Sequence, residues 1–367
     1  MKKILILTWT PFFRSDYKKY DLNYLDKKNR ILIFDISRIL YKKFNIDKIF
    51  KKEQRIKTRK YTNLNKLISD LKKISFNLVI NATGLEGKNI IFDTISKKNI
   101  NIISIYDYKN YETAFYPKKL IYYFKYILKF IRNLISSNSP KEIALLCSDN
   151  IDNKIKCLGK KTIFSHSFGF NYFLRDKNKK KKYNKTVAYV DSGFGFHPDF
   201  FVTKGINKTF DIKSYSYKIN FLFKEFQKLG YTNYFLAHPK VDKRYQKVYK
   251  NCKFIQNNTH KFIKNSDIVI ISSSSSIELA IIYKKKILRI FSKEMKSYPE
   301  NLKDFKALSK FFNNQYLNLD NLFNLNEKIS KNILKPSKLY ANYFKNYIKH
   351  PKSKDIKYSD LFENFTR

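Results

Sequence analysis

The sequence predicts an α/β protein built from two similar units and a helical C-terminal tail. Three observations predict this class. Short apolar runs alternate with longer amphipathic segments along the whole chain. The apolar runs are continuous, as in strands that are buried on both faces of a parallel sheet. The same rhythm begins again after a highly charged stretch near the middle of the chain. Two Rossmann-like domains of this kind hold their ligand in the cleft between them, at the carboxyl ends of the strands.

The size and composition agree with two folded domains. The chain has 367 residues, and a domain typically has about 100–200. Hydrophobic residues make up 43% of the chain, so a large core can form and wholesale disorder is excluded. Lys and Arg together number 75 against 30 Asp and Glu, which gives a net charge of +45. This excess comes from Lys, which favours a bias in composition over a surface selected for nucleic acid.

The cysteines and the apolar segments indicate the cellular compartment in which the protein is expected. There are three cysteines without a C-x-x-C pair or a metal-like spacing, so the sequence predicts no disulfide framework and no cysteine metal site. The first residues, MKKILILTWTPFF, predict a strand better than a signal peptide, because Pro11 and Arg14 interrupt the apolar run. No stretch of 18 apolar residues predicts a transmembrane helix. We therefore expect a cytoplasmic protein.

One segment predicts an amphipathic helix. Leu120–Ile135 carries Lys125, Lys129 and Arg132 at spacings that place them on one helical face. Such a helix either packs on the core with a solvated Lys face or lies on an anionic membrane surface. The second alternative would bring the protein to the inner face of the cell membrane.

In the first half, six apolar runs predict strands and two segments predict helices between them. The predicted strands are Lys3–Thr8, Arg30–Asp35, Asn77–Asn81, Ile100–Ile105, Glu142–Cys147 and Thr162–Ser165. The predicted helices are Lys60–Ile74 and Asn89–Lys98.

The second half repeats this order. The predicted strands are Thr186–Val190, Tyr234–Ala237, Lys253–Gln256, Asp267–Ile271 and Lys286–Phe291. The predicted helices are Tyr215–Leu229, Thr259–Lys264, Ser275–Tyr283 and most of Lys303–Arg367. Gly230 stands where a helix C-cap is expected.

The charged stretch Arg175–Lys185 predicts the domain boundary. It is either a linker or a solvated loop inside one domain. With the linker, the domains are residues 1–180, residues 185–335, and a helical tail, 336–367, that packs back on the first domain.

A first polar cluster follows the strand Thr186–Val190. Asp191 ends this strand and Gly193 makes the turn after it, so the carboxylate is expected to project into the cleft, where it can act as a general base. His197 and Asp199 follow and are further candidates. The alternative is that Asp191 and Asp199 only form turns with nearby backbone N–H groups.

A second cluster follows the strand Tyr234–Ala237. His238 and Pro239 end this strand, and Pro239 fixes the direction in which the chain leaves the sheet. An imidazole held there can donate a hydrogen bond to a phosphate oxygen. Lys240 adds positive charge beside it.

A third cluster is the serine run Ser272–Ser276, between a predicted strand and a predicted helix. Ser275 and Glu278 fit a capping box, which is one interpretation. The other is that hydroxyls and backbone N–H groups near the helix start bind a phosphate. The candidate phosphate ligands are Ser273, Ser274, Ser275 and Ser276.

The three clusters occur in one predicted domain, each directly after a strand. Here the sequence resembles the bacterial sialyltransferases and polysialyltransferases of the GT-B glycosyltransferase fold, over Thr186–Phe291. The family motifs are an acidic pair with Gly, an HP dipeptide and a Ser/Thr pair. Asp191 with Gly193 matches the first motif, His238-Pro239 the second, and serines within Ser274–Ser276 the third.

The resemblance implies a glycosyltransferase of surface-polysaccharide synthesis, for capsule or lipopolysaccharide, that uses a nucleotide-activated sugar such as a CMP-linked acidic sugar. By analogy, Asp191 deprotonates the acceptor hydroxyl, while His238 and the serines bind the departing phosphate. No Asp-x-Asp metal motif stands out, so we expect a metal-independent reaction. The partners are then the nucleotide-sugar donor, on the side of residues 185–335, and a glycan or lipid-linked glycan, on the side of residues 1–180. No cofactor and no specific nucleic acid are expected, because the nucleotide-sugar is a substrate. Lys118, Lys119 and Tyr122–Lys125 are candidates to contact an anionic acceptor.

The sequence departs from the family at Ser192, where the family has a second acidic residue. If the family's base stands at that position, Asp199 or another residue must replace it. Two alternatives follow from the same motifs: a glycerophosphate-type polymer transferase, and a GT-B protein that binds a ligand without transfer. A basic protein that binds nucleic acid or an anionic membrane is the alternative from a different class.

Overall fold

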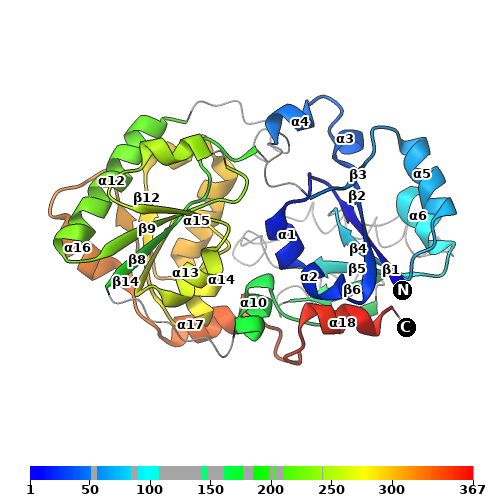
Figure 1. The fold of residues 1–367 in the computed structure, drawn as a ribbon. Helices are drawn as coiled ribbons and strands as arrows, with labels where there is room; N and C mark the ends of the chain where they lie inside the picture. The colour runs from blue at the N-terminus through cyan, green and yellow to red at the C-terminus, as the bar shows by residue number, and fades with distance from the viewer. Residues whose placement is uncertain are drawn as a thin grey trace, which may run out of the picture. The chain divides into compact units, whose positions relative to one another are not determined.

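The computed structural model describes residues 1–50, 56–83, 90–106, 142–147, 161–176, 185–198, 202, 210–241 and 243–366. These residues form two compact units (Figure 1). The first unit holds the described residues below 107, those from 142 to 175 and those from 345 onward. The second holds those from 176 to 344.

The first unit contains a parallel sheet with the strand order β3-β2-β1-β4-β5-β6-β7. Its strands are β1 Lys2–Thr8, β2 Asn29–Asp35, β3 Arg59–Lys60, β4 Leu78–Ala82, β5 Asn101–Tyr106, β6 Glu142–Leu146 and β7 Lys161–Phe164. Its helices before residue 177 are α1 Arg14–Lys19, α2 Leu22–Leu25, α3 Ser37–Leu40, α4 Ile46–Ile49, α5 Leu64–Lys73, α6 Ile90–Ser96 and α10 Phe168–Asp176. Ile4, Leu5, Ile6 and Leu7 of β1 are all fully buried, because both faces of this central strand are covered.

The last part of the chain joins the core of the first unit. Tyr358 and Phe362 of α18 (Tyr358–Asn364) are fully buried among apolar residues of β1, β4 and β6. The Tyr358 hydroxyl donates to the carbonyl of His166, which lies just after β7. Arg175 of α10 forms an ion pair of 2.8 Å with Asp21. These contacts place the chain end over the same core as the first strands.

The second unit contains a second sheet with the order β10-β9-β8-β11-β12-β13, and β14 pairs with β12 in the antiparallel direction. Its strands are β8 Thr186–Val190, β9 Thr232–Ala237, β10 Lys253–Gln256, β11 Ile268–Ile271, β12 Lys286–Phe291, β13 Leu317–Asn318 and β14 Ile333–Leu334. Its helices are α12 Ile212–Lys228, α13 Thr259–Asn265, α14 Ile277–Ile282, α15 Pro299–Phe311, α16 Leu325–Asn332 and α17 Lys338–Tyr343, with short helical segments η3 Lys243–Val248 and η4 Lys293–Ser297; the π-helical segment η5 Phe344–Ile348 follows α17.

Helices cover both faces of this second sheet. In Figure 1, α12 and α16 lie on one side of its strands, and α13 and α14 lie on the other. Tyr215, Ile219, Leu222 and Phe226 follow one another at helical spacing along α12, and all four are fully buried. They pack on residues that alternate along the strands, such as Tyr189 of β8.

The fold class predicted from the sequence is confirmed: the chain is an α/β protein with two Rossmann-like parallel sheets. The predicted strands are present within a residue or two of the predicted ends. The helix predicted at Tyr215–Leu229 begins three residues earlier, at Ile212, because the Asp211 carboxylate accepts the backbone N–H of Ser214 at 2.9 Å. Gly230 follows the C-cap residue Leu229 with φ +79, the left-handed conformation that commonly ends a helix.

One expectation about secondary structure was wrong, and a second needs a detail added. The helix predicted from Lys60 begins at Leu64, because Arg59–Lys60 forms the short edge strand β3 beside β2. The tail from Lys303 is mostly helical, as predicted, and the two short strands β13 and β14 lie between its helices. Strands of two residues carry too few side chains to give a period, so the sequence pattern could not reveal them.

Several predictions concern residues outside the described ranges. These are Leu120–Ile135 with its three cations, the acceptor candidates Lys118, Lys119 and Tyr122–Lys125, and most of the stretch Arg175–Lys185. Among the helices that the structure describes, none has the length and apolar character needed to cross a bilayer.

Candidate functional site

The three polar clusters meet at one edge of the second sheet. Strand β8 lies between β9 and β11, and all three strands run parallel. Val190 at the end of β8 pairs with Leu236 of β9 and with Ile271 of β11. The residues that follow these strands therefore emerge at about the same level. They are Asp191, His238 and Ser272.

Asp191 is buried, with 2% of its surface exposed. Its Oδ1 accepts the backbone N–H of Gly193 at 2.9 Å, and its Oδ2 accepts that of His238 at 3.3 Å. Burial raises the pKa of this carboxyl to about 7, although both backbone hydrogen bonds oppose the shift. This geometry favours the turn-forming alternative over a carboxylate that projects toward a substrate. Asp191 ties the loop after β8 to the loop after β9.

Position 193 requires glycine for two reasons, its backbone conformation and the closeness of His197. Its φ is +72, a left-handed conformation that side chains disfavour. A Cβ added there would lie 3.0 Å from the Cβ of His197 and 3.1 Å from its Cδ2. The backbone N–H of His197 also donates to the Gly193 carbonyl at 2.8 Å. The turn at Gly193 thus brings His197 back over the end of the sheet.

His197 and His238 are in direct contact. Their Nε2 atoms lie 3.0 Å apart, and their ring centroids are separated by 4.0 Å. The backbone N–H of Lys240 donates to Nδ1 of His238 at 3.3 Å. Because Nδ1 then acts as an acceptor, a neutral His238 carries its ring proton on Nε2.

The loop after β9 is held from the neighbouring strand. The amide Nε2 of Gln256, at the end of β10, donates to the carbonyl of Val241 at 3.0 Å. The carbonyls of His238 and Pro239 both lie 3.4 Å from the same nitrogen. One side chain therefore fixes the backbone on both sides of Pro239, so the position of the His238 ring is set by the end of the sheet.

The serine run has an inner and an outer part. Ser272 is fully buried, and its Oγ lies 2.9 Å from Oγ of Ser192. Ser273, Ser274 and Ser276 are half-buried and Ser275 is exposed. The capping box between Ser275 and Glu278 is not formed: the N-cap of α14 is Ser276, whose side chain makes no capping hydrogen bond. The predicted phosphate ligands thus follow a buried anchor, Ser272.

Three further residues shape this edge without a sequence signal. The Tyr298 hydroxyl accepts the backbone N–H of Gly195 at 2.7 Å, and the Tyr245 hydroxyl donates to the Phe194 carbonyl at 3.3 Å. Asn301 donates to Oγ of Ser273 at 3.1 Å. Each comes from a different segment than its partner. A chain rich in Tyr and Asn gave no reason to select these positions.

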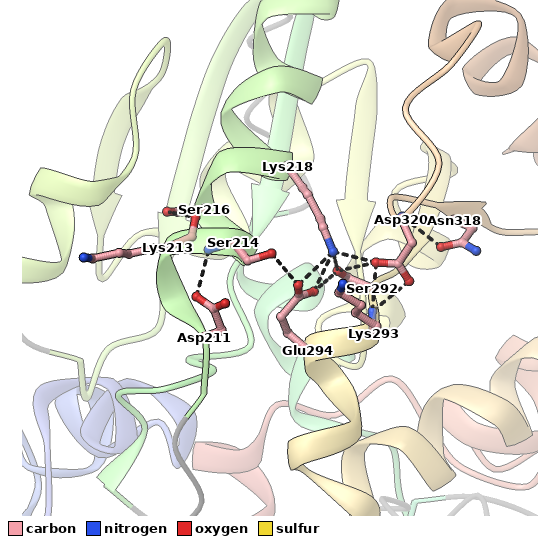
Figure 2. A network of polar contacts seen from close by, with 10 residues as sticks. All are labelled: Asp211, Lys213, Ser214, Ser216, Lys218, Ser292, Lys293, Glu294, Asn318 and Asp320. Atoms are coloured by element: carbon pink, nitrogen blue, oxygen red, sulfur yellow. Dashed lines mark hydrogen bonds and ion pairs between the residues drawn. The ribbon is translucent and has the colours of Figure 1, made fainter.

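A charged cluster lies farther along the same edge, at the ends of β12 and β13 (Figure 2). Nζ of Lys218, from α12, lies 2.8 Å from a carboxylate oxygen of Glu294 and 2.5 Å from one of Asp320. Ser214 and Ser292 also donate hydrogen bonds to Glu294. Burial alone would raise the pKa of Glu294, but these donors lower it to about 2.

The remaining candidates are placed as follows. Lys240 is half-buried and directs its backbone N–H at His238. Asp199 lies outside the described residues. Within the described ranges, no group of three or more His, Cys, Asp or Glu side chains is arranged to hold a metal ion.

Comparisons with known proteins give similarity of structure only. No family model and no curated protein sequence matches the chain. The structure is similar to UDP-GlcNAc 2-epimerase of Methanocaldococcus jannaschii in complex with UDP-GlcNAc and UDP, at 13% identity and TM-score 0.43, over 99% of each chain. It is also similar to MurG of Acinetobacter baumannii, at 10% identity and TM-score 0.41, over 99% of this chain and 100% of that one. For the glycosyltransferase SsfS6 of Streptomyces sp. SF2575, the values are 7% identity and TM-score 0.43, over 100% of both chains. Similarity at this level transfers no activity to this chain.

Proposed function

We propose that this protein is a glycosyltransferase that moves a sugar from a nucleotide-activated donor to a glycan acceptor. The carboxyl edge of the second sheet would hold the phosphate of the leaving nucleotide. The observation that carries the proposal is the convergence of Asp191, His238 and Ser272 at the ends of three adjacent parallel strands. Ligands of open α/β sheets bind at this end of the strands.

His238 would be the residue that contacts the phosphate. Its ring is half-buried, so it is partly open to solvent, and its Nε2 is the nitrogen that carries a proton. An imidazole N–H can stabilise the negative charge that forms on a phosphate oxygen when the glycosidic bond breaks. The half-buried Ser273, Ser274 and Ser276 would supply further donors beside it.

Asp191 would act as a positioning residue. Its carboxyl oxygens accept the backbone N–H groups of Gly193 and His238, so it holds the loops that carry both histidines. The base that removes the acceptor proton would then be another group, with Asp199 as the candidate from the sequence. The donor that the sequence resemblance favours is a CMP-linked acidic sugar.

Ser192 favours a second candidate function, nucleotide binding without transfer. Its buried hydroxyl, bonded to Ser272, occupies the position where the resembled family has a second carboxylate. This candidate and the first share the phosphate site. They differ only in whether a sugar is transferred.

The test is a thermal-shift screen against CMP, CDP, UDP, GDP and ADP, with and without EDTA. A ligand that binds only the folded protein raises its melting temperature. We expect one nucleotide to raise it in the wild type and not in His238→Ala. His260→Ala is the matched control, because it removes a histidine that is not one of the candidate site residues. His260 lies on α13, and its Nε2 is 3.9 Å from Oδ2 of Asp176.

The outcomes separate the two candidates. If the selected nucleotide binds, its sugar conjugate is incubated with glycan acceptors and the released nucleotide is measured. Release that requires acceptor and is lost in His238→Ala supports transfer, whereas binding without release supports the second candidate. The absence of any shift, in a sample that melts cooperatively, contradicts both.

A further inference from the structure

We propose that His197 and His238 form a pair that shares one proton between the two rings, and that a dianionic terminal phosphate binds where the rings meet. When the phosphate binds, the hydrogen bond between the rings opens and the pair takes up one proton. The inference rests on the proposed function, because it concerns the same edge of the sheet. It adds a second histidine to the phosphate site and names the charge of the group that the site prefers.

The distance between the two rings determines how many protons can lie between them. At 3.0 Å, the Nε2 atoms are at hydrogen-bond distance, and only one proton fits between them. Nδ1 of His238 accepts from the Lys240 N–H, so the proton between the rings belongs to His238. His197 therefore accepts through Nε2, and a neutral His197 carries its own proton on Nδ1.

This closed pair has no basic nitrogen ready for a further proton. Nδ1 of His238 faces the N–H of Lys240, and Nε2 of His197 faces the N–H of His238. A proton added to His197 would place two N–H groups face to face, which repel each other. The pair must open, and both N–H groups can then point to the same acceptor. A phosphate dianion is such an acceptor, because it compensates the added charge and accepts from both rings.

The backbone around the pair is fixed, so opening needs only side-chain rotation. His197 is packed on Gly193, where a Cβ would already be too close. The backbone of His238 is bonded to Asp191, and Gln256 holds the residues after it. Two rings on such a frame return to contact when the anion leaves.

Titratable residues on three elements lie beside the pair. Asp191 lies at the end of β8 and accepts the backbone N–H of His238. Lys240 follows β9 and bonds to the His238 ring. Tyr245 of η3 packs with its ring centroid 4.3 Å from that of Phe196, the neighbour of His197. Asp191 changes charge in the neutral range, because burial raises its pKa to about 7, so it needs its own control.

The pair is tested first without ligand. The ring protons of the five histidines are followed by NMR against pH and assigned through single substitutions. We expect the rings of His197 and His238 to shift together in one transition. This common transition should disappear in His197→Gln, because the amide oxygen can accept from His238 but cannot be protonated. Two independent transitions, with that of His238 unchanged by His197→Gln, would overturn the proposed pair.

The phosphate is tested by calorimetry with CMP in two buffers of different ionisation enthalpy. Between about pH 7 and 8 a phosphate monoester is mostly a dianion. We expect the wild type to take up about one proton per CMP bound, so that affinity rises about tenfold for each unit by which the pH falls. His197→Gln should take up none. His260→Gln should keep the uptake. Asp191→Asn is the control for the buried carboxyl: a variant that still binds CMP but takes up no proton would assign the proton to Asp191 and overturn the inference.

The remaining outcomes are distinct. If CMP or another of the screened nucleotides binds without proton uptake, the proposed proton-coupled pair is wrong. The proposed function is not contradicted by that result. No nucleotide binding at any pH contradicts the proposed function and the phosphate part of this inference together, while the ligand-free titration still decides whether the two histidines act as a pair.

Discussion

The Oγ atoms of Ser192 and Ser272 lie 2.9 Å apart and are buried. The first residue follows the end of β8 by two positions, and the second follows β11 directly. The bond joins the loop of the candidate phosphate site that carries His197 to the serine run. The polar side chains at this edge are therefore bonded to one another before any ligand arrives.

This bond predicts a coupled pair of substitutions. Ser192→Ala leaves the buried Ser272 hydroxyl without this partner, which should lower the free energy of unfolding by about 1 kcal/mol. Ser272→Ala should cost a similar amount. The double variant should cost less than the sum, because the second substitution removes a hydroxyl that has already lost this bond. Urea unfolding followed by circular dichroism measures all three, and strictly additive values would contradict the bond.

A second prediction concerns the pH dependence of stability. The pKa of Asp191 rises from 3.8 to about 7 on folding, so between these values the folded protein keeps a proton that the unfolded chain releases. The contribution of Asp191 to stability is thus fully present below about pH 4 and is lost as the pH rises through 7, by up to about 1.4 kcal/mol for each pH unit.

The control for this effect is Asp191→Asn, which cannot ionise. Its stability relative to the wild type should increase between pH 5 and pH 8, and other titrating groups cancel in the difference between the two proteins. Urea unfolding at both pH values measures that difference. A difference that stays constant with pH would show that Asp191 keeps the same charge on folding.

A third prediction uses two glycines with similar backbone conformations. Gly193 and Gly230 have φ values of +72 and +79. At Gly230 a Cβ would meet its nearest heavy atom only at 3.5 Å, whereas at Gly193 it would lie 3.0 Å from His197. Gly230→Ala should therefore cost only the left-handed strain, about 1–2 kcal/mol.

Gly193→Ala should cost more than Gly230→Ala and should also displace His197. We expect weaker nucleotide binding in the thermal-shift screen for Gly193→Ala alone. Equal losses of stability, together with unchanged ligand binding in both variants, would mean that the contact between Gly193 and His197 does not position the ring.

A fourth prediction concerns the charged cluster of Figure 2. Lys218 is 8% exposed and reaches two carboxylates, so Lys218→Met would leave Glu294 and Asp320 without their ammonium partner. We expect a loss of about 3 kcal/mol in the free energy of unfolding. The control is Lys228→Met on the same helix, where the side chain is 58% exposed and pairs with Glu225. That change should cost less than about 1 kcal/mol.

The measurement is denaturant unfolding followed by circular dichroism. Tryptophan fluorescence would not suit it, because the chain has one tryptophan, Trp9, which belongs to the first unit. Since the pKa of Glu294 is lowered to about 2, the cluster's contribution should also be lost as the pH falls from about 4.5 toward 2. Equal losses for both lysine variants would show that the cluster is not a stabilising contact.

The sequence by itself determined the two parallel sheets and the edge at which the polar clusters lie. Continuous runs such as Ile268–Ile271 predict buried parallel strands, and a polar residue directly after such a run must lie at the sheet's carboxyl end. Local pattern is sufficient for this, because strand period and turn chemistry depend on near neighbours in the chain.

Only the tertiary structure decided which atoms those polar residues contact. Asp191 was expected to project toward a substrate, yet its oxygens bond to the backbone of two loops, and one of those loops begins 47 residues later. The contact of His197 with His238 spans 41 residues, and that of Lys218 with Asp320 spans 102. Such partners are set by strand order and helix crossing, which bring distant positions together. The periodicity of a single segment holds no information about them.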